Sequence, residues 1–297
     1  MEFFYQIIPD EHIEYFHYFI DEWGFSIAFL IFILEIIILS FKKIVSKNVL
    51  GDAIANFVTL GLFIAINTFL IGVMYISIFY WVYLNYSIFH IPTNFTSILI
   101  CIFLADSAYY WEHRFTHRVG FGWATHAVHH SSPYFNISVA YRFGPLDGLM
   151  PLIFHLPLAL IGFNPLVIFL SEMVVQVYQT LLHTEVVRKL PKPIETIFNT
   201  PSHHRVHHGS NDEYIDKNYA GILILWDKLF GSFTEENAKV NYGVRTPIET
   251  INPIKIFFFG YVKLLNKMFT SGSLKDSLGY FLMPPDWEPK TISESEK

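Results

Sequence analysis

Histidine is the residue type in this chain that is best placed to do chemistry. The sequence has 14 histidines in 297 residues, and most of them lie in three short boxes. Residues 113–117 form an HxxxH, and residues 126–130 form an HxxHH. A second HxxHH ends the stretch 201–208, and His183 stands alone between these two boxes. Boxes repeated in this way are far less frequent by chance than a single short motif, so they indicate a metal site.

The spacing within the boxes predicts how they would hold metal. Residues four apart lie on one face of a helix, so His113 and His117 can grip one ion together. In an HxxHH the first and last histidines form such a pair, while the second is rotated by about 100° from the last and can serve a neighbouring ion. The two triads, the pair and His183 supply nine imidazoles. This number suits two ions with four or five nitrogens each.

The donor type limits the metal and the fold. Neutral imidazole suits iron, zinc, copper or nickel, whereas magnesium and calcium prefer oxygen ligands. A site made of histidines without an intervening carboxylate is also unlike the soluble di-iron bundles, in which glutamate dominates.

Composition places these boxes in a membrane protein. Hydrophobic residues make up 52% of the chain and charged residues 15%, whereas a soluble domain carries about 25% charge. The net charge of −6 argues against a nucleic-acid partner, because phosphate binding needs a basic face. Cys101 is the single cysteine, which excludes an internal disulfide and a cysteine-based metal site.

Apolar segments must position the boxes. Residues 25–41 and 95–111 are apolar runs, and residues 54–84 have no charge over a length that must tilt, break near Gly72 or extend beyond the lipid. A turn signal divides the region 146–182 into a predicted membrane hairpin. A last stretch, 251–269, carries three lysines, which favours a helix lying on the membrane surface.

These segments predict an all-α fold: an integral membrane helical bundle of about four to five membrane segments, with a cytosolic helical cap that holds a di-metal centre. We divide the chain into N-terminal membrane helices (1–111), a catalytic region (112–250) that includes the hairpin, and a C-terminal amphipathic segment and tail (251–297). Glu35 is the one charge in the first run. Carboxylates are rare at that depth, but no role follows from the sequence.

Positive charge predicts the orientation. The first 24 residues contain no Lys or Arg, so we expect no cleavable signal peptide. The loop after the first run contains three lysines, and every other Lys or Arg follows Trp111. The positive-inside rule then places the N-terminus outside and the histidine boxes on the cytosolic side. The membrane would be a bacterial inner membrane or the endoplasmic reticulum, depending on the source.

Residues 106–233 also carry a family resemblance. The boxes, together with Asp106-Ser-Ala-Tyr-Tyr-Trp-Glu-His113, His183-Thr-Glu, Asp216-Lys-Asn-Tyr219 and Trp226-Asp-Lys-Leu-Phe-Gly231, resemble the sterol desaturase/fatty acid hydroxylase superfamily. Within it, they look closest to the branch that contains alkylglycerol monooxygenase. The sequence departs from that branch at Arg118, where an acidic residue is usual, and at residues 140–144.

The resemblance implies a non-haem di-iron centre that uses dioxygen to attack a lipid C–H bond. Carried over residue by residue, it implies nine metal ligands: His113, His117, His126, His129, His130, His183, His204, His207 and His208. Asp106 lies two turns before His113, and Asp227 follows Trp226, so either carboxylate could accept the other N–H of a ligand ring. His203 is a third candidate for such a supporting role.

The predicted function is therefore hydroxylation or desaturation of a sterol, fatty acyl or alkylglycerol lipid with dioxygen. Lipid C–H bonds are inert to side-chain acids and bases, so the reaction needs a redox metal. Two irons and dioxygen are the predicted cofactor and co-substrate. Electrons must come from a separate donor protein or reductant, and tetrahydrobiopterin is one candidate from the resemblance.

Two other classes of protein deserve comparison. A zinc-dependent membrane hydrolase would use a carboxylate as base, but Arg114 and Ala127 stand where an HExxH box has its glutamate. A metal transporter or other non-enzymatic metal-binding protein would need ligands at the bilayer midplane, whereas the boxes follow the membrane runs. Metal uptake into vesicles would distinguish a transporter from an oxygenase.

Overall fold

The computed structural model describes residues 6–68 and 72–289, and its regular elements are helices. In this part of the chain the β-structure consists of two isolated bridges, Phe198 with Leu223 and Gly209 with Tyr242. The predicted all-α class is therefore confirmed. The helices in chain order are α1 (Asp10–Phe41), α2 (Lys47–Asn67), α3 (Val73–Tyr86), α4 (Phe95–Arg118), α5 (Gly120–His126), η3 (His129–Ser131), η4 (Ile137–Tyr141), η5 (Asp147–Leu149), α6 (Met150–Ile161), α7 (Pro165–Thr180), α8 (Lys192–Ile197), α9 (Pro201–His207), α10 (Leu225–Phe230), α11 (Pro253–Thr270) and α12 (Leu274–Leu282).

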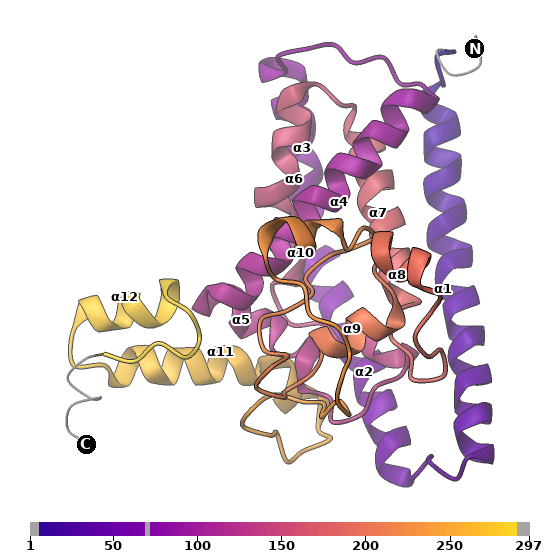
Figure 1. The fold of residues 1–297 in the computed structure, drawn as a ribbon. Helices are drawn as coiled ribbons and strands as arrows, with labels where there is room; N and C mark the ends of the chain where they lie inside the picture. Colours follow the sequence, from indigo (N-terminus) through magenta and orange to yellow (C-terminus); the bar gives the residue numbers. More distant parts are fainter. Residues whose placement is uncertain (1–5, 69–71, 290–297) are drawn as a thin grey trace.

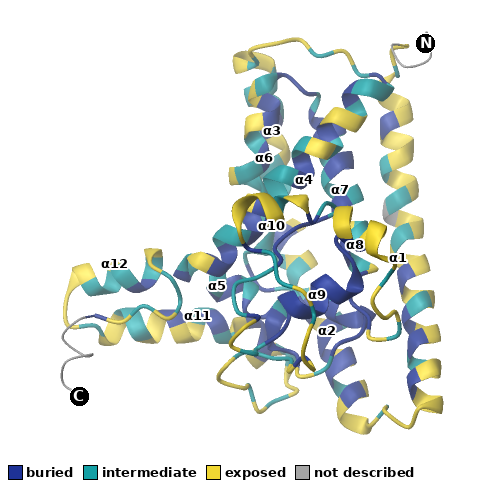
Figure 2. Cartoon of the chain, in the orientation of Figure 1, coloured by how far each residue is buried: buried dark blue, intermediate teal, exposed yellow. Residues whose placement is uncertain are grey.

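Helix α1 runs along the full height of one side of the molecule (Figure 1). Asp10 and Glu11 lie in its first turn, where negative charge interacts favourably with the helix dipole. The helix is longer than the predicted run and exposes many large apolar side chains, such as Leu30 and Phe41, so most of it is yellow in Figure 2. Its only buried charged side chain among those described is Glu35.

The long uncharged run after α1 forms two helices. Helix α2 begins at Lys47, earlier than predicted, because Ser46 caps it by accepting a hydrogen bond from the Val49 amide. It ends at Asn67, and α3 begins at Val73, directly after Gly72. In the described part of the chain, α1 and α2 are long and apolar enough to cross a membrane. The remaining spans among the predicted four to five stay a prediction.

Helix α4 is the central element, packed against α6 and α7. Asn94 and Ser97 form a capping box at its start, and its middle contributes Cys101 and Ala105 to the largest apolar core. The helix continues past Trp111 to Arg118, so the HxxxH box extends the same helix out of the apolar core. The turn between α6 and α7 is made at Gly162, whose φ of +119° suits glycine.

The remaining chain divides into a compact histidine-bearing part and a projecting hairpin. Short helices and loops of residues 120–147 and 183–232 gather around the end of α4, where Figure 2 is darkest. Helices α11 and α12 lie side by side and extend away from the bundle at a large angle to α1 (Figure 1). Gly260 permits the contact of α11 with α5, since a Cβ there would lie 2.0 Å from the Ala124 carbonyl oxygen.

Candidate metal centre

Five separate segments bring the boxes together. The last turns of α4 carry His113 and His117, while α5 ends at His126 and η3 begins at His129. His183 follows the end of α7. The third box lies on α9 and at its C-cap; this helix starts because Thr200 caps it and Pro201 occupies its first turn, where a missing N–H costs nothing.

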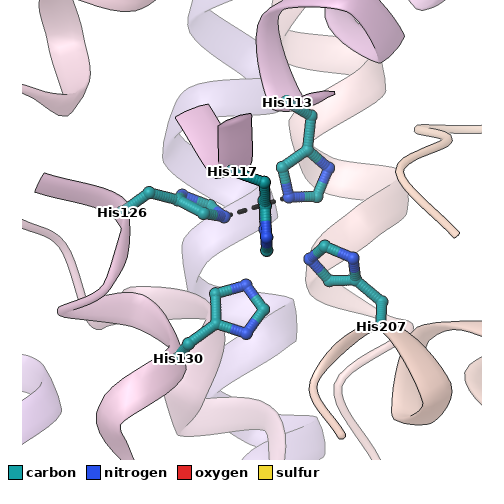
Figure 3. Close-up of side chains that lie close together, drawn as sticks. All are labelled: His113, His117, His126, His130 and His207. Carbon is teal, nitrogen blue, oxygen red and sulfur yellow. Dashed lines mark hydrogen bonds between the residues drawn. The ribbon is translucent and has the colours of Figure 1, made fainter. Parts of the chain in front are cut away.

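The histidines form two groups whose ligand nitrogens all lie within 4.8 Å of one another. We call them the five-histidine cluster and the four-histidine cluster. The five-histidine cluster comprises His113, His117, His126, His130 and His207. The four-histidine cluster comprises His129, His183, His204 and His208. Figure 3 shows the rings of the five-histidine cluster, which come from α4, α5, η3 and α9 and converge on one space. Together the clusters contain all nine predicted ligands.

The two triads divide between the clusters as their spacing predicts. His126 and His130, four apart, lie in the five-histidine cluster, while His129 lies in the four-histidine cluster. In the third box the pair His204 and His208 belongs to the four-histidine cluster, and His207 crosses to the other. Each triad therefore contributes to both clusters and joins them into one centre.

The ring orientations leave Nε2 atoms facing inward. The Nδ1 of His113 lies 2.8 Å from the Tyr219 carbonyl oxygen, and that of His207 lies 3.0 Å from the Lys217 oxygen. A carbonyl can only accept, so these Nδ1 atoms carry the hydrogen and Nε2 is left with a free lone pair. The Nε2 atoms of His113 and His126 lie 3.0 Å apart. Those of His204 and His183 are also 3.0 Å apart.

The electrostatics keep the rings neutral. Burial lowers the pKa of His126, His207 and His208 well below the usual 6.5, and the neighbouring histidines lower it further. Burial also lowers the pKa of His183, to about 4. Neutral imidazole is the form that binds metal. The Nε2 atoms of His117, His130, His207 and His208 are buried and have no hydrogen-bond partner, so the donor set fits two imidazole-binding transition metals.

The two predicted supporting carboxylates, Asp106 and Asp227, contact the loop beside the centre and not the rings of the predicted ligands. Asp227 accepts hydrogen bonds from the Tyr219 and Ala220 amides and from Ser232, rather than from a ligand ring. It thereby holds the loop whose Tyr219 carbonyl orients His113. Asp106 accepts from the backbone amides of Ile222 and Leu223 and from the Trp226 indole. Both carboxylates fix the 219–227 loop.

His203 lies in neither cluster. Its Nε2 is 3.0 Å from Oε2 of Glu195, and the other carboxylate oxygen of Glu195 accepts hydrogen bonds from the Thr200 hydroxyl and the Leu190 amide. This pair steadies the start of α9. The closest carboxylate to a ligand is instead Asp216, 3.8 Å from the Nδ1 of His117 and ion-paired with Arg118 at 2.6 Å. Asp216 belongs to the Asp216-Lys-Asn-Tyr219 segment that carries the family resemblance, but the sequence did not indicate that its carboxylate faces His117.

A buried ion pair between residues that are distant in the sequence supports the second box. Arg142 is 1% exposed and donates to the Asp52 carboxylate at 2.9 Å and to Asn56 at 2.7 Å. It also donates to the Val128 carbonyl and the Ser131 hydroxyl, which flank the histidines of η3. The partners come from α2, some 90 residues away in sequence, so no local pattern could reveal them.

Glu35 gains a structural role. Its carboxylate accepts hydrogen bonds from the Ile137 amide, at 2.8 Å, and from the Thr184 hydroxyl. Thr184 follows the ligand His183, and Ile137 begins η4, which follows the second box. One carboxylate on α1 therefore ties that helix to two segments of the centre.

Two cavities reach the centre through different histidines. The apolar cavity, of about 700 Å³, is lined by parts of α1, α2, α4 and α7 and touches His113, His126, His129 and His183. The second cavity, of about 640 Å³, touches His117, His130, His207 and His208, and we call it the polar cavity because six charged residues line it together with apolar ones. Its other walls come from α5, the 243–249 loop, α11 and α12, and include Asp216, Arg245 and Lys263.

Comparison with known proteins agrees with this geometry. The family model described as fatty acid hydroxylase matches residues 98–232, a range that contains both histidine clusters. No solved structure gives a significant match to the chain.

The similar curated proteins are lipid enzymes. Human alkylglycerol monooxygenase is 41% identical over 211 residues, which cover 70% of this chain and 47% of that protein. The zebrafish (Danio rerio) alkylglycerol monooxygenase is 40% identical over 215 residues, 72% of this chain and 48% of the relative. An ornithine lipid hydroxylase from Rhizobium tropici is 32% identical over 137 residues, 46% of this chain and 41% of the relative. The chain thus spans about half the length of the curated relatives it matches.

Proposed function

We propose that this protein is a membrane-bound, histidine-ligated di-iron oxygenase that oxidises a lipid, since residues 98–232 match the fatty acid hydroxylase family model. The observation that carries the proposal is the meeting of two histidine clusters with the end of an apolar cavity. The nine histidines would hold two irons, which would supply the redox chemistry that activates dioxygen. Neutral rings with fixed tautomers suit that task.

The chain's own residues would bind and orient the lipid. Apolar side chains of α1 and α2, such as Phe25, Ile31 and Phe63, line the apolar cavity as far as the histidines. A hydrocarbon chain there loses contact with water and gains close packing. The carbon nearest His113 and His129 is the one expected to react. In a hydroxylation the substrate gains one oxygen atom, and the other leaves as water with two electrons and two protons from a donor.

The electrons would come from outside the chain. The polar cavity supports this part of the proposal, because charged walls favour a water-soluble molecule and its four histidines differ from those of the apolar cavity. We propose that α1 and α2 are among the membrane spans, with the histidine centre on the cytosolic side. The positive charge after α1 supports this orientation.

The deciding experiment measures metal in the purified, detergent-solubilised chain after anaerobic loading with ferrous iron. We expect about two irons per chain, and a loss of iron in both His129→Ala and His207→Ala. The exposed His90 gives the matched control, and His90→Ala should keep both irons. Absence of bound iron in the wild-type chain after this loading would refute the proposal, whereas zinc alone before loading would not decide it, because zinc can displace iron from histidine ligands.

The substrate class is tested on the loaded protein with a reductant. Alkylglycerols, ornithine lipids and sterols are the lipids to compare, and a product should form only with dioxygen present. Labelled dioxygen should place one oxygen atom in a hydroxylated lipid and none in a desaturated one. Product formation without dioxygen would contradict the proposal.

A further inference from the structure

A second polar cluster lies in the helix bundle, outside both histidine clusters. His155 on α6 has its Nδ1 3.5 Å from a carboxylate oxygen of Glu112 on α4. The same nitrogen lies 3.6 Å from a carboxylate oxygen of Glu172 on α7. His155 is 2% exposed and Glu112 7%. We call these three side chains the acceptor cluster; the proposed metal chemistry uses none of them.

The three side chains of the acceptor cluster make no hydrogen bond to one another. The Nε2 of His155 lies 3.3 Å from the Ala105 carbonyl oxygen, so the ring hydrogen is on Nε2 and Nδ1 is an acceptor. Tyr75 already donates its hydroxyl hydrogen to Glu172, at 2.7 Å. The Nδ1 of His155 and Oε2 of Glu112 are buried without a hydrogen-bond partner. Buried acceptors left unpaired cost free energy, so a donor from a ligand is expected here.

The acceptor cluster faces a cavity that adjoins the apolar cavity. This third cavity has a volume of about 440 Å³ and is lined by all three members of the cluster. Its wall shares Tyr109, Glu112, Pro151, Met173 and Gln176 with the apolar cavity. Because Glu112 lines both cavities, a lipid that lies beside His113 in the apolar cavity, with its chain along α1 and α2, can reach this member of the acceptor cluster.

Charge restricts what can occupy the space. The two cavities are lined by the acids Glu112, Asp147 and Glu172, and no Lys or Arg is among the described residues of their walls. A phosphate or carboxylate group would meet no Lys or Arg among these residues and would offer no donor to the free acceptors. A group with N–H or O–H donors would satisfy the free acceptors, and a positive charge would also complement the carboxylates.

We propose that the acceptor cluster binds the polar end of the lipid substrate, and that this end carries several N–H or O–H donors and no negative charge. An ammonium group fits best and a hydroxyl group second. That the bound lipid is a substrate rests on the proposed function, whereas the existence of the binding site does not. Since Glu112 and His113 both line the apolar cavity, the oxidised carbon would lie close to the polar end rather than at the far end of the chain.

The test measures binding without turnover, using the full-length, detergent-solubilised chain kept without reductant or dioxygen. The probes share one alkyl chain and differ at the end: a primary ammonium, an alcohol, a trimethylammonium and a phosphate. We expect the primary ammonium to bind most tightly, followed by the alcohol. Trimethylation keeps the charge but removes the donors, and should weaken binding about tenfold, the loss expected for one charge-assisted hydrogen bond. The phosphate should bind weakest of all.

Variants separate binding from folding. Glu172→Gln should weaken the primary ammonium about tenfold, because it loses both a charge and a charge-assisted hydrogen bond, and should weaken the trimethylammonium, which uses only the charge, by less. His155→Gln gives a second, independent change within the cluster. Glu213 is exposed and lies outside the cavities, so Glu213→Gln is the matched control and should change nothing.

Two results would overturn the proposal. One is equal affinity of the wild-type chain for all four probes. The other is a Glu172→Gln variant that weakens every probe equally, which would indicate a structural role only. Because this assay uses neither dioxygen nor electrons, its outcome is independent of the iron measurement that tests the proposed function.

Discussion

The histidine-bearing region and the N-terminal helices are held together by different physics. Between residues 126 and 232, buried polar side chains are frequent, and most of them have a named partner, as Arg142 and Asp227 do. Helices α1 and α3 instead expose large apolar side chains and bury few polar ones. Directional hydrogen bonds hold each side chain of the first region in one orientation. Apolar packing in the second region tolerates the replacement of one apolar side chain by another of similar size.

The side chains of the metal centre need more exact positions than those of the apolar cavity. A metal centre needs each ring in one orientation, and the carbonyls of Tyr219 and Lys217 provide that for His113 and His207. A hydrocarbon cavity needs only shape and dryness. The two regions meet at Glu35 of α1 and at Asp52 and Asn56 of α2, where the N-terminal helices take part in the directional network of the centre.

Metal removal should produce the largest contrast between the two regions. Binding of metal by neutral histidines stabilises the fold by an amount on the order of 10 kcal/mol, and that contribution acts on the segments that hold the rings. After anaerobic chelation we expect faster amide hydrogen exchange in residues 113–146 and 183–232, with little change in α1. Equal acceleration in α1 would show that the regions unfold as one unit.

Acid should act in the same direction as chelation. The histidine pKa values are lowered on folding, so below the usual 6.5 the unfolded chain takes up protons that the folded chain does not. Stability is therefore fully present above 6.5 and falls as the pH decreases, for His183 down to about 4. Metal content and melting temperature between pH 7 and pH 4.5 measure this. Stability that rises with acid would contradict the assigned neutral rings.

Asp227→Ala tests the network without touching a ligand. The change leaves the amides of Tyr219 and Ala220 and the Ser232 hydroxyl without their buried acceptor, at a cost of roughly 3 kcal/mol. Denaturation should show this loss, and iron content should fall with it. Asp212 is exposed, so Asp212→Ala should change stability by less than about 0.5 kcal/mol.

Prediction from sequence succeeded where the signal was local and failed where partners were distant. The spacing of the boxes predicted that His126 and His130 lie together and apart from His129, and the two clusters have this division, although His129 and His130 lie on η3 rather than on the same helix as His126. The run that ends at Trp111 was predicted as a helix, although α4 continues to Arg118. No spacing connects Arg142 to Asp52, or Glu112 to Glu172, because only the tertiary fold brings those pairs together.

Glu35→Gln tests the junction of the two regions. Glutamine keeps one acceptor oxygen, so either the Ile137 amide or the Thr184 hydroxyl loses its partner, at a cost of about 1–2 kcal/mol. Because Thr184 follows His183, we expect weaker metal binding by the four-histidine cluster than by the five-histidine cluster. Metal titration that resolves two affinities measures the effect, and equal weakening of both would refute it.

The smallest effect belongs to the exposed face of α1. Leu30 is 58% exposed, so Leu30→Ala removes little buried apolar surface, and stability should change by less than about 0.5 kcal/mol. Iron content should not change. A melting temperature lowered as far as in Asp227→Ala would mean that α1 is packed more specifically than its exposed surface indicates.

The separation of the apolar and polar cavities has a kinetic consequence. Each cavity contacts a different set of four histidines. A lipid in the apolar cavity and a water-soluble reductant in the polar cavity would therefore not compete for space at the centre. Turnover should then proceed through a ternary complex, with converging rather than parallel lines in a double-reciprocal plot. A soluble inhibitor that fills the polar side would reduce the maximal rate and leave the apparent affinity for lipid unchanged.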